Sequence, residues 1–489
     1  MICITVTPES RKFGKVDILN AARKGDIIEV CLDRLLREPD IKDLLSVTDK
    51  PIIVSCRRRE DGGQWDGTEE ERLMLLRQAI VAGPAYIELD LAVAGDIKRF
   101  GKTQRVISFT RLDRPEPDLD AVFDEASQAQ ADVVKFTWPT PTIDDAWPLL
   151  RAVSQKKSAP IVGIGLGRAE LTFSLLGYKY GSPWIYAALE KGMEAFEGQA
   201  TVFELEETYA LREIDRHTGF VAVAGGGDSQ TSAIRVLNSG FRELGMNVRC
   251  LPVVPGEVAS LKKMLDALKI RAVVVGGEYG AALLPLADTI DPLDRSWGFV
   301  DLLLRRDDGW HGYSTLWRSG LKALESTLGK GADGKGPLAQ RSVLVLGNGA
   351  VAYGMAAATA QRGGLVSLCG PSDKESQQSA TKLGCRFVPF QNLYDTLADV
   401  AIIADRGLEV GSAHGCINAA VLRPQMTVLD VSDPPVQHEL FVEARLRGCK
   451  LVSPEAVSAD RLAAQFKGIT GQELSAKAQA AGAGAVAAG

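Results

Sequence analysis

The sequence predicts an α/β protein with two units in tandem, and three observations support this. The chain has 489 residues, which is too long for one ordinary core, since a domain usually holds about 100–200 residues. Short apolar runs alternate with longer polar and helical stretches, a rhythm typical of parallel strands covered by helices. A glycine-rich turn between a buried strand and a helix at 347–352 indicates a nucleotide-binding fold in the second unit.

Eight candidate strands before residue 210 predict the first unit. They are Ile2–Val6, Ile27–Val30, Ile52–Cys56, Tyr86–Leu91, Arg105–Phe109, Val133–Phe136, Ile161–Ile164 and Trp184–Ala187. Eight buried strands in about 200 residues favour a (β/α)8 barrel over residues 1–210. An open doubly wound sheet is the alternative.

A new alternation of strands and helices begins after the barrel. It predicts one domain at 218–328 and, after the flexible connector Gly329–Pro337, a Rossmann domain at 338–475. Residues 476–489 are almost all Ala and Gly. Such a segment has little with which to form a core, so we expect a disordered tail.

The glycine turn follows the strand Ser342–Leu346 directly. Gly347 permits a tight turn, Gly349 lets a pyrophosphate approach the backbone, and Ala352 allows the helix to pack closely on the strand. The expected cofactor-binding residues are Gly347, Asn348, Gly349, Ala350 and Val351. The next strand ends without the acid of NAD sites or the arginine of NADP sites. The turn therefore predicts the fold and leaves the nicotinamide cofactor open.

Bulk composition narrows the range of partners. The net charge of −6 argues against nucleic acid, and no apolar run reaches the roughly 20 residues of a membrane span. The eight cysteines are scattered without a C-x-x-C pair, which favours free thiols in a reducing cytoplasm. No spacing of His, Asp or Glu indicates a metal. We therefore expect a cytoplasmic protein that binds a small molecule and has neither a nucleic-acid nor a membrane partner.

Charged residues gather where the predicted barrel strands end, which is where barrel enzymes carry their chemistry. They are Glu29, Asp33, Arg57–Arg59, Glu88, Asp90 and Lys135. Burial disfavours the charge of a lysine, so Lys135 could attack a ketone and form a Schiff base. Alternatively, it pairs with Glu29 or Glu88 and does no chemistry. No histidine precedes His217, so the barrel lacks the usual proton carrier.

These segments, in this order, resemble type I 3-dehydroquinate dehydratase. The resemblance rests on Asp26–Asp33, Pro51–Arg57 with Gly62-Gly63, Ala131–Lys135 and Gly198-Gln199. The second half resembles shikimate dehydrogenase, and the whole resembles the bifunctional fusion of plants and some bacteria. The resemblance implies two steps of aromatic amino acid biosynthesis on cyclohexane carboxylates. A Schiff base would dehydrate 3-dehydroquinate to 3-dehydroshikimate, and NADPH would then reduce this product to shikimate.

The resemblance also implies site residues by position. Lys135 matches the Schiff-base lysine. The substrate-binding positions are Glu29, Arg57, Gln199, Ser229, Thr231 and Gln465.

Several positions depart from the family pattern. In the barrel, Cys31 replaces an arginine, Thr110 replaces the general acid/base histidine, and Ser174 replaces a second substrate arginine. In the second half, Gly280 stands where the catalytic lysine belongs, and Leu316 stands where the aspartate belongs. Threonine cannot titrate near neutrality, and loss of a general acid/base typically costs roughly 10²–10⁴-fold in rate.

Three hypotheses remain open from the sequence. The chain is a bifunctional enzyme with impaired activity, above all in its dehydrogenase half. Alternatively, it is a degenerate paralogue that binds a ligand or regulates, or an enzyme that uses Lys135 on another substrate.

Overall fold

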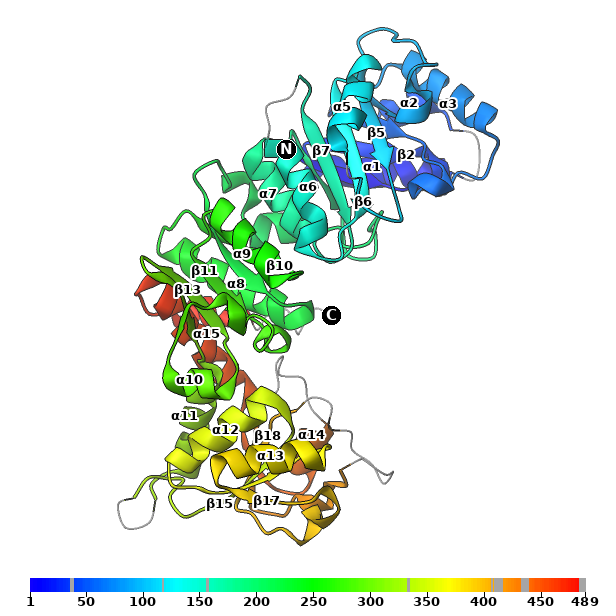
Figure 1. Cartoon of the computed structure of the whole chain (residues 1–489). Helices are drawn as coiled ribbons and strands as arrows, with labels where there is room; N and C mark the ends of the chain where they lie inside the picture. The colour runs from blue at the N-terminus through cyan, green and yellow to red at the C-terminus, as the bar shows by residue number, and fades with distance from the viewer. Residues whose placement is uncertain are drawn as a thin grey trace. The chain divides into compact units, whose positions relative to one another are not determined.

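The computed structural model describes residues 1–35, 39–116, 118–154, 158–331, 335–405, 408, 417–431 and 439–482 (Figure 1). The chain divides into two compact units. Unit 1 holds Met1–Phe220 and Asn247–Leu261, and unit 2 holds Val221–Met246 and Lys262–Gly489. Among the described residues, no helix is both long and apolar enough to cross a membrane.

Unit 1 is built on a sheet of eight parallel strands in the order β7-β6-β5-β4-β3-β2-β1-β8. The strands are β1 (Ile2–Val6), β2 (Ile27–Cys31), β3 (Ile52–Ser55), β4 (Tyr86–Asp90), β5 (Gln104–Thr110), β6 (Val133–Pro139), β7 (Ile161–Leu166) and β8 (Ile185–Ala188). The two edge strands, β7 and β8, also contact each other. The sheet is thus a nearly closed barrel, and the predicted (β/α)8 architecture is confirmed.

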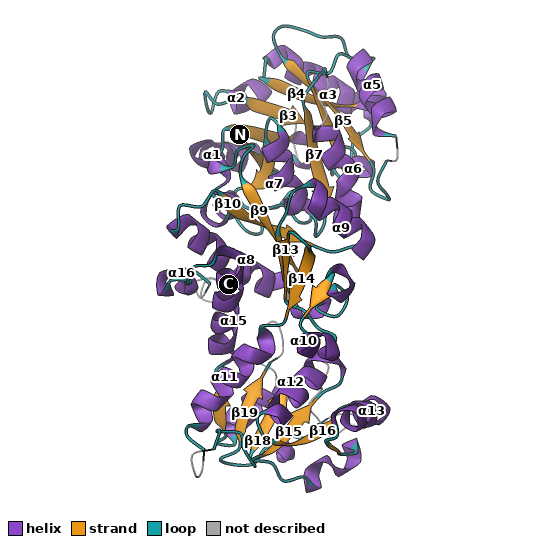
Figure 2. Cartoon of the chain, turned by 60° about the vertical axis from the view of Figure 1, so that its left-hand side comes forward, coloured by secondary structure: helices purple, strands orange, loops and turns teal. Residues whose placement is uncertain are grey.

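Helices surround these strands (Figure 2). They are α1 (Arg11–Lys24), α2 (Ile41–Leu45), α3 (Glu69–Ala82), α4 (Leu91–Ala94), α5 (Leu119–Gln128), α6 (Ile143–Ser154) and α7 (Glu170–Tyr180). Local signals in the sequence set where they begin. Thr68 and Glu71 form a reciprocal capping box at the start of α3, which satisfies amides that a helix otherwise leaves unpaired.

A second, mixed sheet has the order β10-β9-β11-β13-β14-β12. Its strands are β9 (Gly219–Ala224), β10 (Val248–Val253), β11 (Ala272–Val275), β12 (Thr289–Ile290), β13 (Leu302–Arg306) and β14 (Gly309–Tyr313). The helices in this part of the chain are α8 (Gly227–Glu243), α9 (Val258–Ala267), α10 (Pro292–Trp297) and α11 (Leu316–Leu328).

The third sheet is parallel and has the order β17-β16-β15-β18-β19-β20, the strand order of a Rossmann fold. Its strands are β15 (Ser342–Leu346), β16 (Leu365–Cys369), β17 (Arg386–Phe387), β18 (Val400–Ile403), β19 (Thr427–Asp430) and β20 (Lys450–Val452). The helices that accompany it are α12 (Gly349–Gln361), α13 (Asp373–Leu383), α14 (Glu439–Leu446) and α15 (Pro454–Thr470). The strand, glycine turn and helix are formed as predicted by β15, residues 347–348 and α12.

The C-terminal segment differs from the disorder expected over 476–489. Residues Ala476–Ala480 form helix α16, which contacts α8, and Ala478 is fully buried. Ser475 caps the helix by accepting a hydrogen bond from the Ala478 amide. Alanine has the highest helix propensity, so a short alanine-rich segment folds once a neighbouring surface covers it. Residues 483–489 lie outside the described residues.

Candidate active site

The interior of the barrel has two layers of different chemistry. Residues two apart in a strand point to the same face. Cys3, Ile27, Ile53, Val106 and Val133 belong to an apolar cluster. The residues two positions further along these strands are all polar and buried: Thr5, Glu29, Ser55, Ser108 and Lys135. Because all the strands are parallel, this polar layer lies toward the carboxyl ends, where barrel active sites form.

Lys135 is at the centre of the polar layer. Its Nζ lies 2.8 Å from Glu88 Oε2 and 3.7 Å from Glu29 Oε1. It also lies 4.7 Å from the centroid of the Tyr186 ring, a cation–π contact. The exposed fraction of the Lys135 side chain is 1%. The structure therefore brings the predicted Schiff-base lysine and the predicted acid Glu29 together, and it adds Glu88 as the nearer carboxylate.

The two carboxyl groups beside Lys135 differ in their proton affinity. Burial acts to raise the pKa of Glu29, but the charges of Arg57 and Lys135 outweigh it and lower the pKa to about 2. Burial raises the pKa of Glu88 above its ordinary value, against the opposing charges of Lys135 and Arg57, and the neighbouring Glu29 charge adds to the rise. Glu29 is therefore the fixed anion, and Glu88 is the carboxyl group that takes up a proton more readily.

Arg57 binds the fixed anion. Its Nη2 donates to Glu29 Oε1 at 2.9 Å and to Cys31 Sγ at 3.1 Å. Its Nε is buried and has no hydrogen-bond partner among the described residues. A buried guanidinium N–H without a partner is costly unless something else accepts its hydrogen bond, so this atom is available to a ligand. A side chain at Gly63 would collide with the Arg57 carbonyl at 2.1 Å, which accounts for the glycine there.

Gln199 joins the layer from the loop after β8. Its Nε2 donates to Thr5 Oγ1 at 3.2 Å, and its Oε1 accepts from the Ala195 amide at 2.7 Å. Thr5 in turn hydrogen-bonds Glu29. The preceding Gly198 has φ +84°, a conformation that favours glycine. Gln199 is thus connected to the cluster around Lys135.

Unit 2 has a polar cluster of its own around Asp301. This carboxylate accepts hydrogen bonds from the backbone amides of Thr315 and Leu316 and from Arg461 Nε at 3.1 Å. Gln465 Nε2 donates to the Asp301 carbonyl at 3.0 Å. Of the residues predicted for substrate binding in this half, Gln465 lies in this cluster. Ser229 and Thr231 lie on α8, where the Thr231 hydroxyl bonds the Gly227 carbonyl.

The two replaced dehydrogenase positions are enclosed by apolar side chains. A side chain at Gly280 would begin 2.2 Å from the Phe299 ring. Leu316 is buried in the same core cluster as Phe299. Among the described residues, no group of three His, Cys, Asp or Glu side chains is placed to hold a metal ion.

The chain is similar in sequence to known proteins. Residues 2–216 match the family model of type I 3-dehydroquinase. This part of the chain is therefore similar to type I 3-dehydroquinases. The bifunctional 3-dehydroquinate dehydratase/shikimate dehydrogenase of Arabidopsis thaliana, a chloroplastic protein, is 24% identical over 96% of this chain and 82% of its own length. The chain therefore resembles the fusion of these two enzymes.

Two solved structures resemble the chain at low sequence identity. Dehydroquinate dehydratase and shikimate dehydrogenase from S. pombe AroM covers 99% of this chain and 98% of its own, with 16% identity and a TM-score of 0.44. Shikimate 5-dehydrogenase from Thermus thermophilus, in complex with NADP(H) and shikimate, covers 55% of this chain and 99% of its own, with 22% identity and a TM-score of 0.46.

The barrel has a further buried acid, Glu170, beside the replaced position Ser174. Ser174 Oγ donates to Glu170 Oε1 at 2.5 Å, and burial raises the pKa of Glu170 to about 8. Thr110 is the last residue of β5. His217, the one histidine in the sequence of unit 1, is exposed and accepts a hydrogen bond from Arg216. It therefore does not replace the missing imidazole inside the barrel.

Sequence reasoning missed several residues of these sites, among them Glu170 and Arg461. Arg461 stands four residues before Gln465 on α15, and residues at that spacing share a helix face. That spacing could have identified it. No sequence pattern pointed to Glu170, because Ser174, its hydrogen-bond partner, was interpreted only as the replacement of a substrate arginine.

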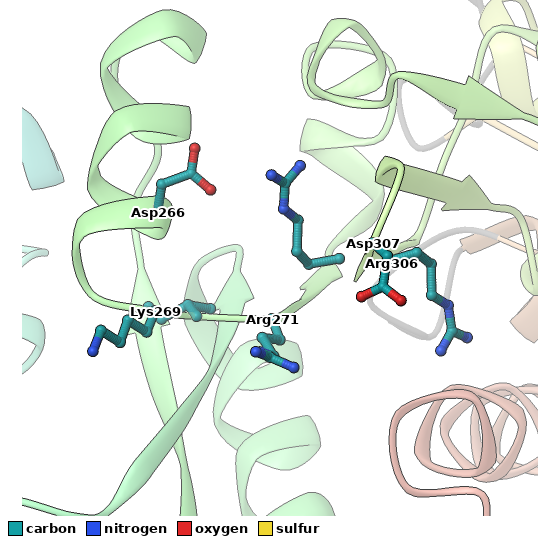
Figure 3. Close-up of a pocket in the computed structure, with 7 residues that line it drawn as sticks. Asp266, Lys269, Arg271, Arg306 and Asp307 are labelled. Carbon is teal, nitrogen blue, oxygen red and sulfur yellow. The ribbon is translucent and has the colours of Figure 1, made fainter.

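A separate hollow in unit 2 lies at the start of β11 and the end of β13. It has a volume of about 280 Å³. Its lining residues include Asp266, Lys269, Arg271, Arg306 and Asp307. Figure 3 shows Lys269 and Arg306 pointing away from each other. Since these cations do not converge, we assign no ligand to this surface.

Proposed function

We propose that the barrel forms a Schiff base between Lys135 and the ketone of 3-dehydroquinate and dehydrates it to 3-dehydroshikimate. The observation that carries the proposal is the buried contact of Lys135 Nζ with Glu88 Oε2 at 2.8 Å. An ammonium has no lone pair, so the lysine must lose a proton before it attacks a carbonyl carbon. Glu88 is within direct proton-transfer distance of that nitrogen.

We assign to Glu88 the proton transfers for which the family uses a histidine. Burial raises the pKa of Glu88, which makes it a better proton acceptor than an exposed carboxylate. The amine adds to the ketone, the carbinolamine loses water, and an imine forms. The imine withdraws electrons, so a proton leaves the adjacent carbon and the neighbouring hydroxyl departs as water. Hydrolysis of the imine returns Lys135, and the net change is the loss of one water.

The other residues of the layer hold the substrate in this proposal. Arg57 Nε is a buried donor that has no hydrogen-bond partner among the described residues, and a substrate carboxylate or hydroxyl would satisfy it. Glu29 is held as an anion and accepts from a substrate hydroxyl. Gln199 closes the layer beside Thr5.

Turnover by the full-length protein tests the dehydration. We expect 3-dehydroquinate to yield 3-dehydroshikimate, seen as the absorbance of the new conjugated enone. Lys135→Met should abolish this activity. Lys179→Met is the matched control, because Lys179 is a lysine of the same unit that bonds the Thr218 carbonyl. No product from the wild type, or equal loss in both variants, would refute the assignment.

For unit 2 we propose that hydride transfer is lost. The family's reaction needs a lysine and an aspartate, for which this chain has Gly280 and Leu316. Phe299 fills the space beside Gly280, and Leu316 is buried in an apolar core. NADP is the cofactor that the resemblance implies. We expect shikimate-dependent reduction of NADP at background level, and a normal rate would show that the two positions are misassigned.

A second candidate for the barrel is a protein that binds the ligand without turning it over. The pairing of Ser174 with Glu170 favours it, since an arginine for the substrate carboxylate is absent there. This candidate predicts that 3-dehydroquinate stabilises the protein while no enone forms. An enzyme acting on a different ketone would instead form the Schiff base with that ketone. Cytoplasmic location stays a prediction from the scattered cysteines.

A further inference from the structure

We infer that unit 2 has filled its dinucleotide site with its own side chains, so that it is a closed scaffold and binds neither NADP(H) nor NAD(H). Two groups of residues fill the site. Asp405 lies on the glycine turn. Trp297, Phe299, Leu316 and Trp317, here called the apolar wedge, lie against the first turns of α12. This inference concerns the binding of a dinucleotide. The replacement of the catalytic residues at 280 and 316 does not by itself decide whether a dinucleotide binds.

The side chain of Asp405 lies against the glycine turn, where a bound phosphate would lie. Its Oδ2 accepts a hydrogen bond from the Asn348 amide at 3.2 Å, and a side chain at Gly347 would begin 2.6 Å from Asp405 Cβ. A pyrophosphate binds a Rossmann turn through backbone amides at the helix start. The Asp405 carboxylate binds the amide of Asn348, the residue directly before α12, and its negative charge repels that of a phosphate.

The side chain of Asn348 closes the next part of the site. Its Nδ2 donates to the Ser372 carbonyl at 3.3 Å and to Ser376 Oγ at 2.9 Å, and its Oδ1 accepts from the Ser372 amide at 2.9 Å. These bonds tie the turn to the segment after β16, where the acid or arginine that meets the adenosine ribose would stand. Residues 370–372 contain neither an acid nor an arginine, and Ser372 and Ser376 bond Asn348.

The apolar wedge fills the space that the nicotinamide half would enter. Trp297 and Trp317 pack edge to face with centroids 4.5 Å apart. The wedge faces Ala350, Val351, Gly354 and Met355 of α12, and the remaining cavity is about 10 Å³. That volume is about the space of one water. A nicotinamide ring does not fit without displacing these side chains.

The wedge is built into the core of unit 2. Trp317 Nε1 donates to Asp294 Oδ1 at 3.0 Å, and the Arg318 guanidinium lies 4.3 Å from the centroid of the Trp317 ring. Asp294 is fully buried and also accepts from the Ser314 amide. These contacts hold the ring in place, so opening the site would disrupt a satisfied buried carboxylate.

The first test is a titration of the full-length wild type with NADPH and NADH at up to millimolar concentration. Isothermal calorimetry and quenching of tryptophan fluorescence by the bound dihydronicotinamide report binding, because Trp297 and Trp317 belong to the wedge. We expect neither heat nor quenching beyond dilution and inner-filter controls. The thermal unfolding midpoint should not move, since a ligand that binds the native state raises it. Saturable binding to the wild type would overturn the inference.

The second test reopens the site with Asp405→Ser and Trp317→Ala together. The first change removes the carboxylate from the turn, and the second empties part of the wedge. We expect saturable NADPH binding to appear, with a gain of at least tenfold in affinity over the limit set for the wild type. Asp399→Asn is the matched control, because Asp399 caps the Ser342 amide at the start of β15; it should gain nothing.

A double variant that keeps its fold by circular dichroism and still binds no dinucleotide would also overturn the inference, since Asp405 and the wedge are named as the cause. If this variant does not fold, the wild-type titration decides alone. Either result is independent of the barrel, whose substrate and lysine are not involved.

Discussion

Lys135 on β6 and Glu88 on β4 meet across β5, with Nζ 2.8 Å from Oε2, although they are 47 residues apart in the sequence. Both side chains are buried. A buried ion pair is stabilising only when its geometry is good and its remaining polar atoms are satisfied. Burying this ion pair therefore has a desolvation cost that lowers the stability of the fold. The proposed chemistry gives the pair a role that accounts for this cost.

Glu88→Gln should lower kcat/KM for 3-dehydroquinate by roughly 10²–10⁴-fold, the usual effect of losing a general acid/base. Glutamine keeps the shape but cannot accept the lysine proton. In the wild type the rate should fall as the pH falls through the pKa of Glu88, which burial raises above 4.5. This fall of the rate at low pH, the acid limb of the pH profile, should be absent in Glu88→Gln. A variant that keeps the limb would show that another group carries the proton.

Arg57→Met should destabilise unit 1 by about 3 kcal/mol, because it removes the nearer of the two cations beside the buried Glu29 carboxylate and leaves only Lys135, at 3.7 Å. Urea unfolding followed by circular dichroism measures this. Arg59→Met is the matched control, since Arg59 forms an ion pair with Asp66 at the surface and such pairs contribute little. Similar stability of the two variants would contradict the role given to Arg57.

Glu170 predicts an unusual pH dependence of stability. Its pKa is raised to about 8 by burial, so the folded state holds a proton that the unfolded state releases near 4.5. Between these values stability falls as the pH rises, by about 1.4 kcal/mol per pH unit. Glu170→Gln should remove this slope between pH 5 and 8. Ser174→Ala, which keeps the acid and removes its hydrogen bond, should retain it. Equal slopes in the wild type and Glu170→Gln would contradict the assignment.

Gly280→Lys should not restore shikimate dehydrogenase activity. The new side chain would begin 2.2 Å from the Phe299 ring, and overpacking of this kind typically costs about 1–3 kcal/mol. The thermal unfolding midpoint of unit 2 should fall. Gly336→Lys serves as control, because nothing lies within 4 Å of a side chain at that position. A stable and active Gly280→Lys protein would show that the site is open.

The strand pattern predicted most of the fold, because local periodicity records which face of a strand is buried. The same pattern placed Glu29, Arg57 and Lys135 at one end of the barrel. It left open whether Glu29 or Glu88 pairs with Lys135. Which of the two carboxylates lies nearer to Lys135 depends on how the barrel strands are shifted relative to one another. The sequence of a single strand does not determine that shift.

In unit 2 the sequence predicted the fold and did not predict whether a cofactor binds. The glycine turn at 347–352 predicted the Rossmann fold, and the fold is present. The contact of Asn348 with Asp405 joins residues 57 positions apart, and the wedge combines α10, α11 and the segment between them. Such contacts follow from packing. The turn therefore indicates the architecture, and its neighbours in space decide whether a cofactor binds.

Reductive trapping tests the central claim most directly. The full-length wild type is incubated with 3-dehydroquinate and sodium borohydride, and the intact and digested protein is analysed by mass spectrometry. We predict one adduct per chain, located on Lys135 and absent from Lys135→Met. An unlabelled protein, or label spread over surface lysines at the same rate in the wild type and in Lys135→Met, would contradict a Schiff-base barrel.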